Sequence, residues 1–161
     1  MHDSSISKYL EAIKSSIPSY HVYQCLEDVE WNNKLISLYL RDKVSELDNM
    51  LNALSEGRLI RGDISIELNM ITTLLGRLLE LSNNIRDFKP SKIDSSVFNK
   101  LVEYDYRIIV IINRCLFLIS KPYRYPIDLV IRLKMVREAL NKLFDIVRSR
   151  YEFLKLKSKS S

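Results

Sequence analysis

The sequence predicts an all-α protein, a bundle of four to five helices around one apolar helix at about Asp94–Ser120. Glycine and proline occur only three and four times in 161 residues, so turns are few and the segments between them are long. Ile108–Ile119 is the most apolar stretch, too short to span a bilayer and long for a strand. Other helices usually surround a helix that is apolar on nearly all sides. We expect one domain over residues 1–156 and a disordered basic tail over residues 157–161.

Two helices are expected before Gly57. The first, about Ser4–Ser16, carries apolar side chains at helical spacing along one side. A second helical segment covers about Ser19–Ser55, and Asn32 and Asn33 either break it or only bend it. Gly57 suits the position just after its end, because glycine accepts the left-handed conformation that closes many helices.

The third helix is expected to be capped at Asp63 and to present an apolar seam. Its apolar residues are spaced by steps that alternate between four and three, which is typical of a helix packing nearly parallel or antiparallel to a partner. The seam consists of Ile64, Leu68, Ile71, Leu75, Leu78 and Ile85, with Ser82 in the one gap.

The last two helices are separated by a proline-containing loop. Asp94 or Ser95 is expected to cap the central helix, because a short oxygen-bearing side chain can satisfy the free N–H groups of a first turn. Pro122 ends that helix, since proline disfavours helical geometry in the residue before it. The last helix is expected to begin at Pro126, whose missing N–H is not needed there, and to run to about Leu156.

Residues that usually carry catalytic or metal chemistry are few. The two histidines, His2 and His21, and two scattered cysteines, Cys25 and Cys115, cannot assemble a usual zinc or iron–sulfur site. No nucleophile has an evident histidine partner, and the sequence contains no glycine-rich phosphate loop. We therefore expect a non-catalytic binding module without a cofactor.

The cysteines and the N-terminus indicate a compartment. Cys25 and Cys115 both fall on apolar faces, which predicts buried free thiols and is consistent with a reducing cytoplasm. The first residues, MHDSSISKY, lack the basic region and apolar run of a signal peptide. We expect a cytoplasmic protein with no membrane partner.

The net charge of +5 is divided unevenly along the chain. Residues 1–120 carry 14 Lys/Arg and 16 Asp/Glu, a net of −2, whereas residues 121–161 carry 11 and 4, a net of +7. A basic C-terminal segment on a nearly neutral body suggests a polyanionic partner. The alternative is a solvated helix face followed by a basic tail, and charge alone leaves both open.

Charged residues also interrupt the central helix. The acidic cluster from Glu103 to Asp105 is interpreted as a solvated face that balances Lys100 and Arg107, in preference to a general acid–base pair. Arg114 interrupts the most apolar stretch, so it either pairs with a buried carboxylate or opens onto a surface that binds an anion.

Basic residues recur at helical spacing and form the candidate nucleic-acid interface. On the central helix four of them are spaced by seven residues, nearly two turns, so their side chains line up. On the last helix four more share one flank of the apolar seam, and a loop arginine lies between two tyrosines. Such stripes suit a chain of phosphates, because each contact releases counterions. The candidates are Lys100, Arg107, Arg114, Lys121, Arg124, Lys134, Arg137, Arg148 and Lys155.

The order of these features resembles the small helical subunit of type III CRISPR effector complexes, the type III-A form in particular. The residues that carry the resemblance are the helix Ile64–Ile85, RIIVIINR at Arg107–Arg114 and LFDIVRSRYEFLK at Leu143–Lys155. The resemblance implies a non-catalytic subunit in antiviral defence, whose copies stack on themselves and on other subunits. It also implies contact with the backbone of the RNA target beside the crRNA, without sequence readout.

Two other interpretations stay open. LNALSEGRLIRG at Leu51–Gly62 and RDF at Arg86–Phe88 resemble, more weakly, the accessory third subunit of archaeal primase, which implies a non-catalytic role in replication. The remaining alternative is a helical protein–protein scaffold without a nucleic-acid role. Absence of RNA or DNA binding at low salt would favour that scaffold.

Overall fold

The computed structural model describes residues 2–56 and 62–159, and within them the chain is helical without a β-strand. This confirms the predicted all-α class. The helices are α1 (His2–Ser16), α2 (Leu26–Ser55), α3 (Gly62–Asp87), the short 3₁₀ turn η1 (Ser95–Val97), α4 (Phe98–Ser120) and α5 (Pro126–Lys159). In the part of the chain so described, no helix is both long enough and apolar enough to cross a membrane.

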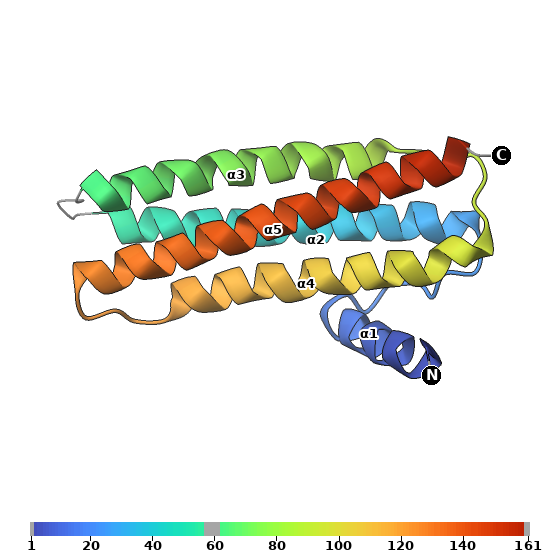
Figure 1. The fold of residues 1–161 in the computed structure, drawn as a ribbon, viewed down its shortest axis with the longest axis horizontal. Coiled ribbons are helices and arrows are strands. Elements are labelled where there is room, and N and C mark those ends of the chain that lie inside the picture. The colour runs from blue at the N-terminus through green and yellow to red at the C-terminus, as the bar shows by residue number, and fades with distance from the viewer. Residues whose placement is uncertain (1, 57–61, 160–161) are drawn as a thin grey trace.

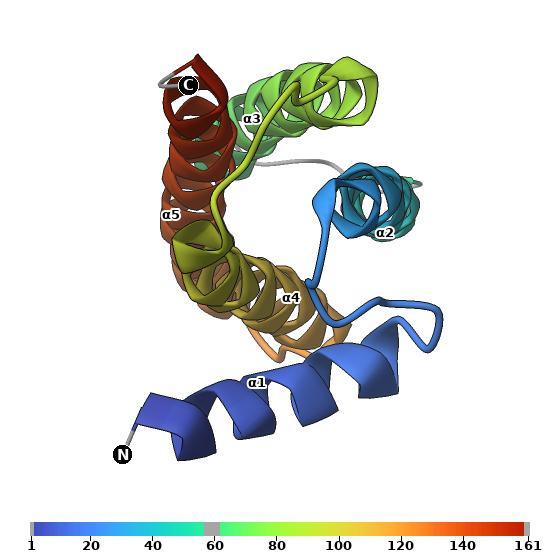
Figure 2. The ribbon, with the colours of Figure 1, turned by 90° about the vertical axis from the view of Figure 1, so that its right-hand side faces the viewer.

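Helices α2 to α5 form a bundle in which consecutive helices run in opposite directions (Figure 1). Contacts join α2 to α3, α3 to α5, α5 to α4 and α4 to α2, so α2 and α5 occupy opposite corners of the bundle. The connection over residues 88–94 crosses the end of the bundle from α3 to α4 (Figure 2). Helix α1 lies outside this four-helix arrangement and packs on α4 (Figure 2).

Helix α4 is central in its contacts but is not enclosed on all sides. It packs against α1, α2 and α5. Asp94 caps the turn η1 by accepting a hydrogen bond from the Ser96 backbone N–H at 2.9 Å, and α4 itself begins at Phe98. Val110 and Phe117 are exposed, so the apolar run lines the core on one side and meets solvent on the other. The predicted seam of α3 faces the core: Ile64, Ile71, Leu75, Leu78, Ser82 and Ile85 are buried and Leu68 is half-buried.

Asn32 and Asn33 do not break α2, which is continuous from Leu26 to Ser55. Both side chains are buried. The Asn32 side chain accepts from the His21 backbone N–H at 3.0 Å and donates to the His21 carbonyl at 2.8 Å. The residues before Leu26, expected to be helical from Ser19, are instead held by α2 side chains.

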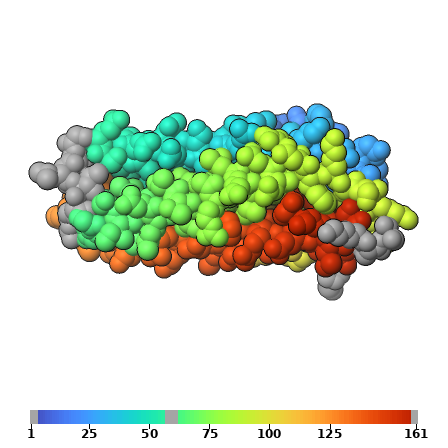
Figure 3. Space-filling view, turned by 90° about the horizontal axis from the view of Figure 1, so that it is seen from above, coloured from blue at the N-terminus to red at the C-terminus, as the bar shows by residue number. Residues whose placement is uncertain are grey.

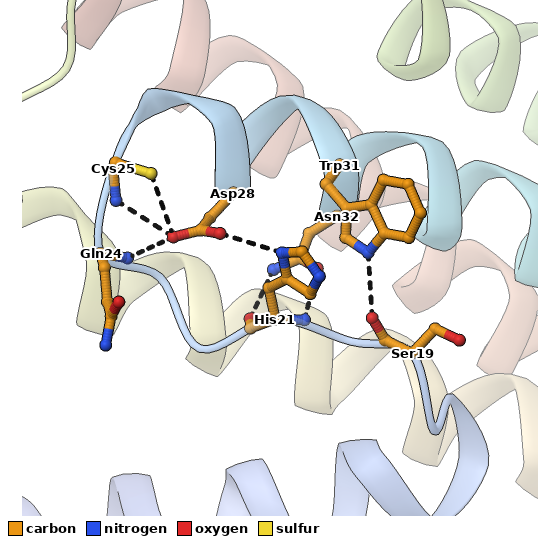
Figure 4. A network of polar contacts seen from close by, with 7 residues as sticks. All are labelled: Ser19, His21, Gln24, Cys25, Asp28, Trp31 and Asn32. Atoms are coloured by element: carbon orange, nitrogen blue, oxygen red, sulfur yellow. Dashed lines mark hydrogen bonds and ion pairs between the residues drawn. The ribbon is translucent and has the colours of Figure 1, made fainter.

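The connection between α1 and α2 is fixed by Asp28 and Trp31 (Figure 4). The Asp28 carboxylate accepts from the Gln24 and Cys25 backbone N–H groups at 2.9 and 3.2 Å, and it lies 2.9 Å from His21 Nδ1. Trp31 Nε1 donates to the carbonyl of Ser19 at 2.9 Å. Cys25 is exposed at the start of α2, so the prediction that this thiol is buried is wrong.

The predicted disordered tail is wrong for residues 157–159, which continue helix α5. Ser158 is buried, and its hydroxyl accepts a hydrogen bond from the Ser91 backbone N–H at 3.1 Å. The end of α5 is therefore fastened to the connection between α3 and α4. Residues 160–161 and Gly57 lie outside the described residues.

Arg150 of α5 is the largest of the fully buried side chains in the described part of the chain. Its Nε donates to Asp105 Oδ1 at 2.6 Å, and its Nη1 donates to Asn33 Oδ1 at 2.8 Å. Its Nη2 donates to the Tyr23 hydroxyl at 3.2 Å. One guanidinium thus connects α5 to α4, to α2 and to the connection between α1 and α2.

Asp105 of α4 completes this buried network. Its Oδ2 accepts from the hydroxyls of Tyr20 and Tyr23, each at 2.5 Å. The prediction that Asp105 lies on a solvated face is therefore wrong. The buried pairing considered for Arg114 belongs instead to Arg150, because Arg114 is exposed.

The network holds its tyrosines neutral. Burial, the largest effect, and the negative charge of Asp105 raise the pKa of Tyr20 and of Tyr23 well above the usual value. Burial, the largest single effect, lowers the pKa of Arg150, but the charge of Asp105, its hydrogen bond with Arg150 and the neighbouring tyrosines together outweigh burial, so this pKa lies above its usual value. The interior therefore contains one charged pair with two neutral phenols bonded to it.

Replacing Arg150 with methionine should lower the free energy of unfolding by about 3–5 kcal/mol, because Asp105 would be left as an unpaired buried charge. In the double variant Arg150→Met/Asp105→Leu, the loss should be smaller than the sum of the two single losses. Urea denaturation measures all three. The matched control is Arg148→Met, an exposed arginine two residues earlier, which should change stability by less than about 0.5 kcal/mol.

Stability should also fall in alkaline solution through Tyr20 and Tyr23. The unfolded chain releases phenol protons near about pH 10, whereas the folded protein retains them to higher pH. Above that pH the unfolded state binds fewer protons, so the free energy of unfolding decreases as pH rises. Urea denaturation across this range should show a shallower decrease for Tyr20→Phe/Tyr23→Phe than for the exposed control Tyr125→Phe. Equal slopes would contradict the assignment.

Candidate nucleic-acid interface

A groove of about 380 Å³ runs between α4 and α5 and contains two of the predicted site residues, Arg107 and Arg114. Lys142 and Glu138 of α5 face them across the groove. Three positive charges and one negative charge give the lining a net charge of +2. The remaining lining residues are Val110, Ile111, Met135 and Ala139.

The cations of this groove are not engaged by other protein groups. Among the described residues, Arg107, Arg114 and Lys142 have neither a hydrogen bond nor an ion pair from their side chains, and all three are exposed. A guanidinium presents planar N–H groups that match the oxygens of a phosphate or carboxylate. The groove can therefore accept an anion without first breaking an internal pair.

The groove exists because α1 covers only part of α4 (Figure 1). Tyr9 of α1 stacks on Tyr106 of α4, with ring centroids 4.2 Å apart. Beyond this contact the same side of α4 is uncovered, and Val110, Arg114 and Phe117 are exposed there. The helical repeat places these residues one turn apart along one side.

Lys121 and Arg124 extend the basic surface beyond Arg114. Phe117, one turn after Arg114, is 59% exposed, and the Lys121 ammonium lies 4.4 Å from its ring centroid. Arg124 is exposed in the loop before α5. Arg132 fixes this loop by donating to the carbonyls of Lys121 and, at 2.9 Å, Pro122.

The four predicted residues of α5 lie on the other flank of that helix, toward α3. Arg137 is bound to the buried carboxylate of Glu67 on α3, with Nε 2.6 Å from Oε2. Arg148 pairs with Asp145 at 3.3 Å. The Lys155 ammonium lies 5.0 Å from the ring centroid of Tyr151, and Lys134 is exposed.

Lys100 does not line the groove between α4 and α5. Its ammonium lies 3.5 Å from Glu103 and 5.1 Å from the ring centroid of Tyr104. It lines a recess shared with Ser5 and Tyr9 of α1. Of the predicted residues, only Arg107 and Arg114 share the groove. The others lie in three different places: at the end of α4 and in the loop that follows it, on the flank of α5 toward α3, and in the recess beside α1.

Lys142 lines the groove but is absent from the residues predicted from the sequence. It lies on the flank of α5 that faces α4, and its spacing of seven residues from Met135 could have indicated a shared face.

The thiol of Cys115, beside Arg114 in sequence, is buried, which raises its pKa to about 12. This thiol therefore stays protonated near neutral pH. Among the side chains that the structure describes, no three from His, Cys, Asp or Glu converge as a metal site.

Comparison with protein-family models, with curated proteins and with solved structures finds no match to this chain.

Replacing Arg107 or Arg114 with alanine should leave the melting temperature nearly unchanged, because an exposed side chain without an internal partner contributes less than about 0.5 kcal/mol to stability. Thermal unfolding followed by circular dichroism measures this, and Arg137→Ala is the comparison, since it removes the partner of buried Glu67. A large melting shift at Arg114 would contradict its placement in an open groove.

Proposed function

We propose that the protein is a non-catalytic nucleic-acid-binding subunit that contacts backbone phosphates through the groove between α4 and α5. The observation that carries this proposal is that Arg107, Arg114 and Lys142 converge on one groove without internal partners. Phosphates gain most from such cations, because their binding releases counterions and breaks no existing ion pair. A single strand of RNA or DNA is the partner that this surface fits.

The proposed binding is sequence-tolerant. Arg107 and Arg114 lie seven residues apart, about 10 Å along the helix, a spacing that the backbone repeat sets and that lets each contact a different phosphate of one strand. Phe117 offers an exposed ring on which any base can stack, since every base has an aromatic face. Both contacts read the strand's charge and shape, and neither depends on base edges.

Within this class, the preferred assignment is the small subunit of a type III CRISPR effector complex in the cytoplasm. Arg107 and Arg114, which bound the segment that resembles that family, are the free cations of the α4 side of the groove. Part of the segment Leu51–Gly62 lies outside the described residues, so the accessory primase subunit remains the alternative from sequence alone. Neighbouring genes for a crRNA-binding backbone protein or for primase subunits would distinguish the two.

Alanine at Arg107 or Arg114 should weaken binding of single-stranded RNA by about 1–2 kcal/mol, because each change removes a charge-assisted phosphate contact. The slope of log affinity against log salt should become shallower by about 1 for each variant. Fluorescence anisotropy of a labelled oligonucleotide at low and moderate salt measures both quantities.

The controls separate the groove from the rest of the basic surface. Lys43→Ala removes a lysine of α2 that pairs with Glu46, and it should leave RNA affinity unchanged. Arg148→Ala tests the flank of α5 toward α3. Equal losses for Arg148→Ala and Arg114→Ala would move the interface away from the groove. Absence of binding at low salt, for both the free and the assembled protein, would favour the scaffold alternative.

A further inference from the structure

We propose that the first half of α1, residues 4–10, is a strap that limits how far a bound strand extends along α4. While the strap is docked, the strand ends near Arg107. When the strap lifts, the strand reaches Lys100. This inference rests on the nucleic-acid binding proposed above, because it extends the surface that begins in the groove between α4 and α5.

The basic stripe of α4 continues toward α1. Lys100 precedes Arg107 by the same seven residues that separate Arg107 from Arg114, so it lies on the same side of the helix, about 10 Å further along. Lys100 shares a recess of about 470 Å³ with Ser5 and Tyr9 of α1. A strand that follows the stripe beyond Arg107 therefore meets α1, which lies beside the first half of α4 (Figure 1).

Tyr9 of the strap covers an aromatic ring on which a base can stack. Its ring lies on that of Tyr106, with centroids 4.2 Å apart and planes inclined by 19°. Bases of single strands stack on aromatic side chains in the same face-to-face manner. Tyr106 directly precedes Arg107, so lifting the strap uncovers a stacking surface next to the first cation of the groove.

The strap is held less firmly than the second half of α1. Ile13, and Ile17 just after the helix, are buried, whereas no side chain of residues 4–10 is buried. Helix α1 packs on α4 from outside the four-helix arrangement (Figure 2). Segments with few buried contacts open locally at a small fraction of the global free energy of unfolding. The strap can therefore lift while Ile13 keeps the second half of α1 docked.

The strap lies on one side of the bundle. On the opposite side, α2, α3 and α5 form the surface and lie against one another (Figure 3). The tyrosine stack places α1 over the first half of α4, whereas the groove with Arg114 and Lys142 lies further along that helix. Lifting the strap therefore lengthens the accessible surface of α4 without separating the helices of the bundle.

The test compares two single-stranded RNAs at low salt by fluorescence anisotropy, one of about 4 nucleotides and one of about 12. The variant Ile6→Ala/Tyr9→Ala loosens the strap. It should bind the longer strand about tenfold more tightly than the wild type does, the gain from one further charge-assisted phosphate contact. Its affinity for the shorter strand should not change, because that strand needs only the groove.

Lys100→Ala identifies the contact that the strap limits. It should leave the affinity of the wild type for the longer strand unchanged, and it should remove the gain in the loosened variant. Lys43→Ala, a lysine of α2 paired with Glu46, should alter neither affinity. An equal loss from Lys100→Ala in both backgrounds would mean that the strand reaches Lys100 beneath a docked strap, which would overturn the proposal.

A linked variant keeps the strap docked. Ser5→Cys and Asn99→Cys place thiols on the α1 and α4 sides of the recess, and a short bismaleimide joins them. The background is Cys25→Ser, because Cys25 is exposed whereas Cys115 is buried. The loosening substitutions should raise the affinity for the longer strand before linking and not after it. A gain that persists after linking would contradict the strap.

Failure of the strap and failure of the groove give different results. Binding that depends on Arg107 and Arg114 but ignores both loosening and linking would overturn the strap alone. Absence of RNA binding in every variant would overturn the groove, and the strap with it. A cooperative melting transition, followed by circular dichroism, checks that the loosened variant remains folded.

Discussion

The buried pair of Arg150 and Asp105 is the constraint on which the arrangement of the helices depends. An apolar seam tolerates small shifts of one helix along another, because one leucine can replace another in contact. A buried charge does not, since it must keep its partner and its hydrogen bonds. Arg150 and Asp105 together bond to Asn33, Tyr20 and Tyr23, so α2, α4, α5 and the connection after α1 must meet at one place.

The same pair determines which side of α4 faces solvent. An α-helix turns by about 100° per residue, so Arg107 lies about 200° and Arg114 about 180° from Asp105. Turning Asp105 into the core therefore turns both arginines outward, as their exposure shows. The open basic groove is in this way a geometric consequence of the buried network, although none of its residues touches Arg150.

Helix positions and the apolar seam of α3 followed from hydrophobic periodicity, which is local. The burial of Asp105 and Arg150 did not, because charged residues are rarely buried and nothing in their spacing shows which ones find partners across 45 residues of sequence. Arg114 interrupts an apolar run, which suggested a buried partner for it, yet one side of that run is exposed. The extended connection after α1 depends on Asp28 and on other side chains of α2, which local propensity also does not reveal.

Internal pairing, more than net charge, decides which cations are available to an anion. A phosphate that approaches Arg137 competes with the carboxylate of Glu67, whose buried charge would then be stranded. A phosphate that approaches Arg107 or Arg114 displaces only water and counterions. The excess of positive charge in residues 121–161 therefore overstates the basic surface of α5, part of which is neutralised against α3. Free cations occur instead at Arg107 and Arg114 of α4 and at Lys142, on the flank of α5 that faces α4.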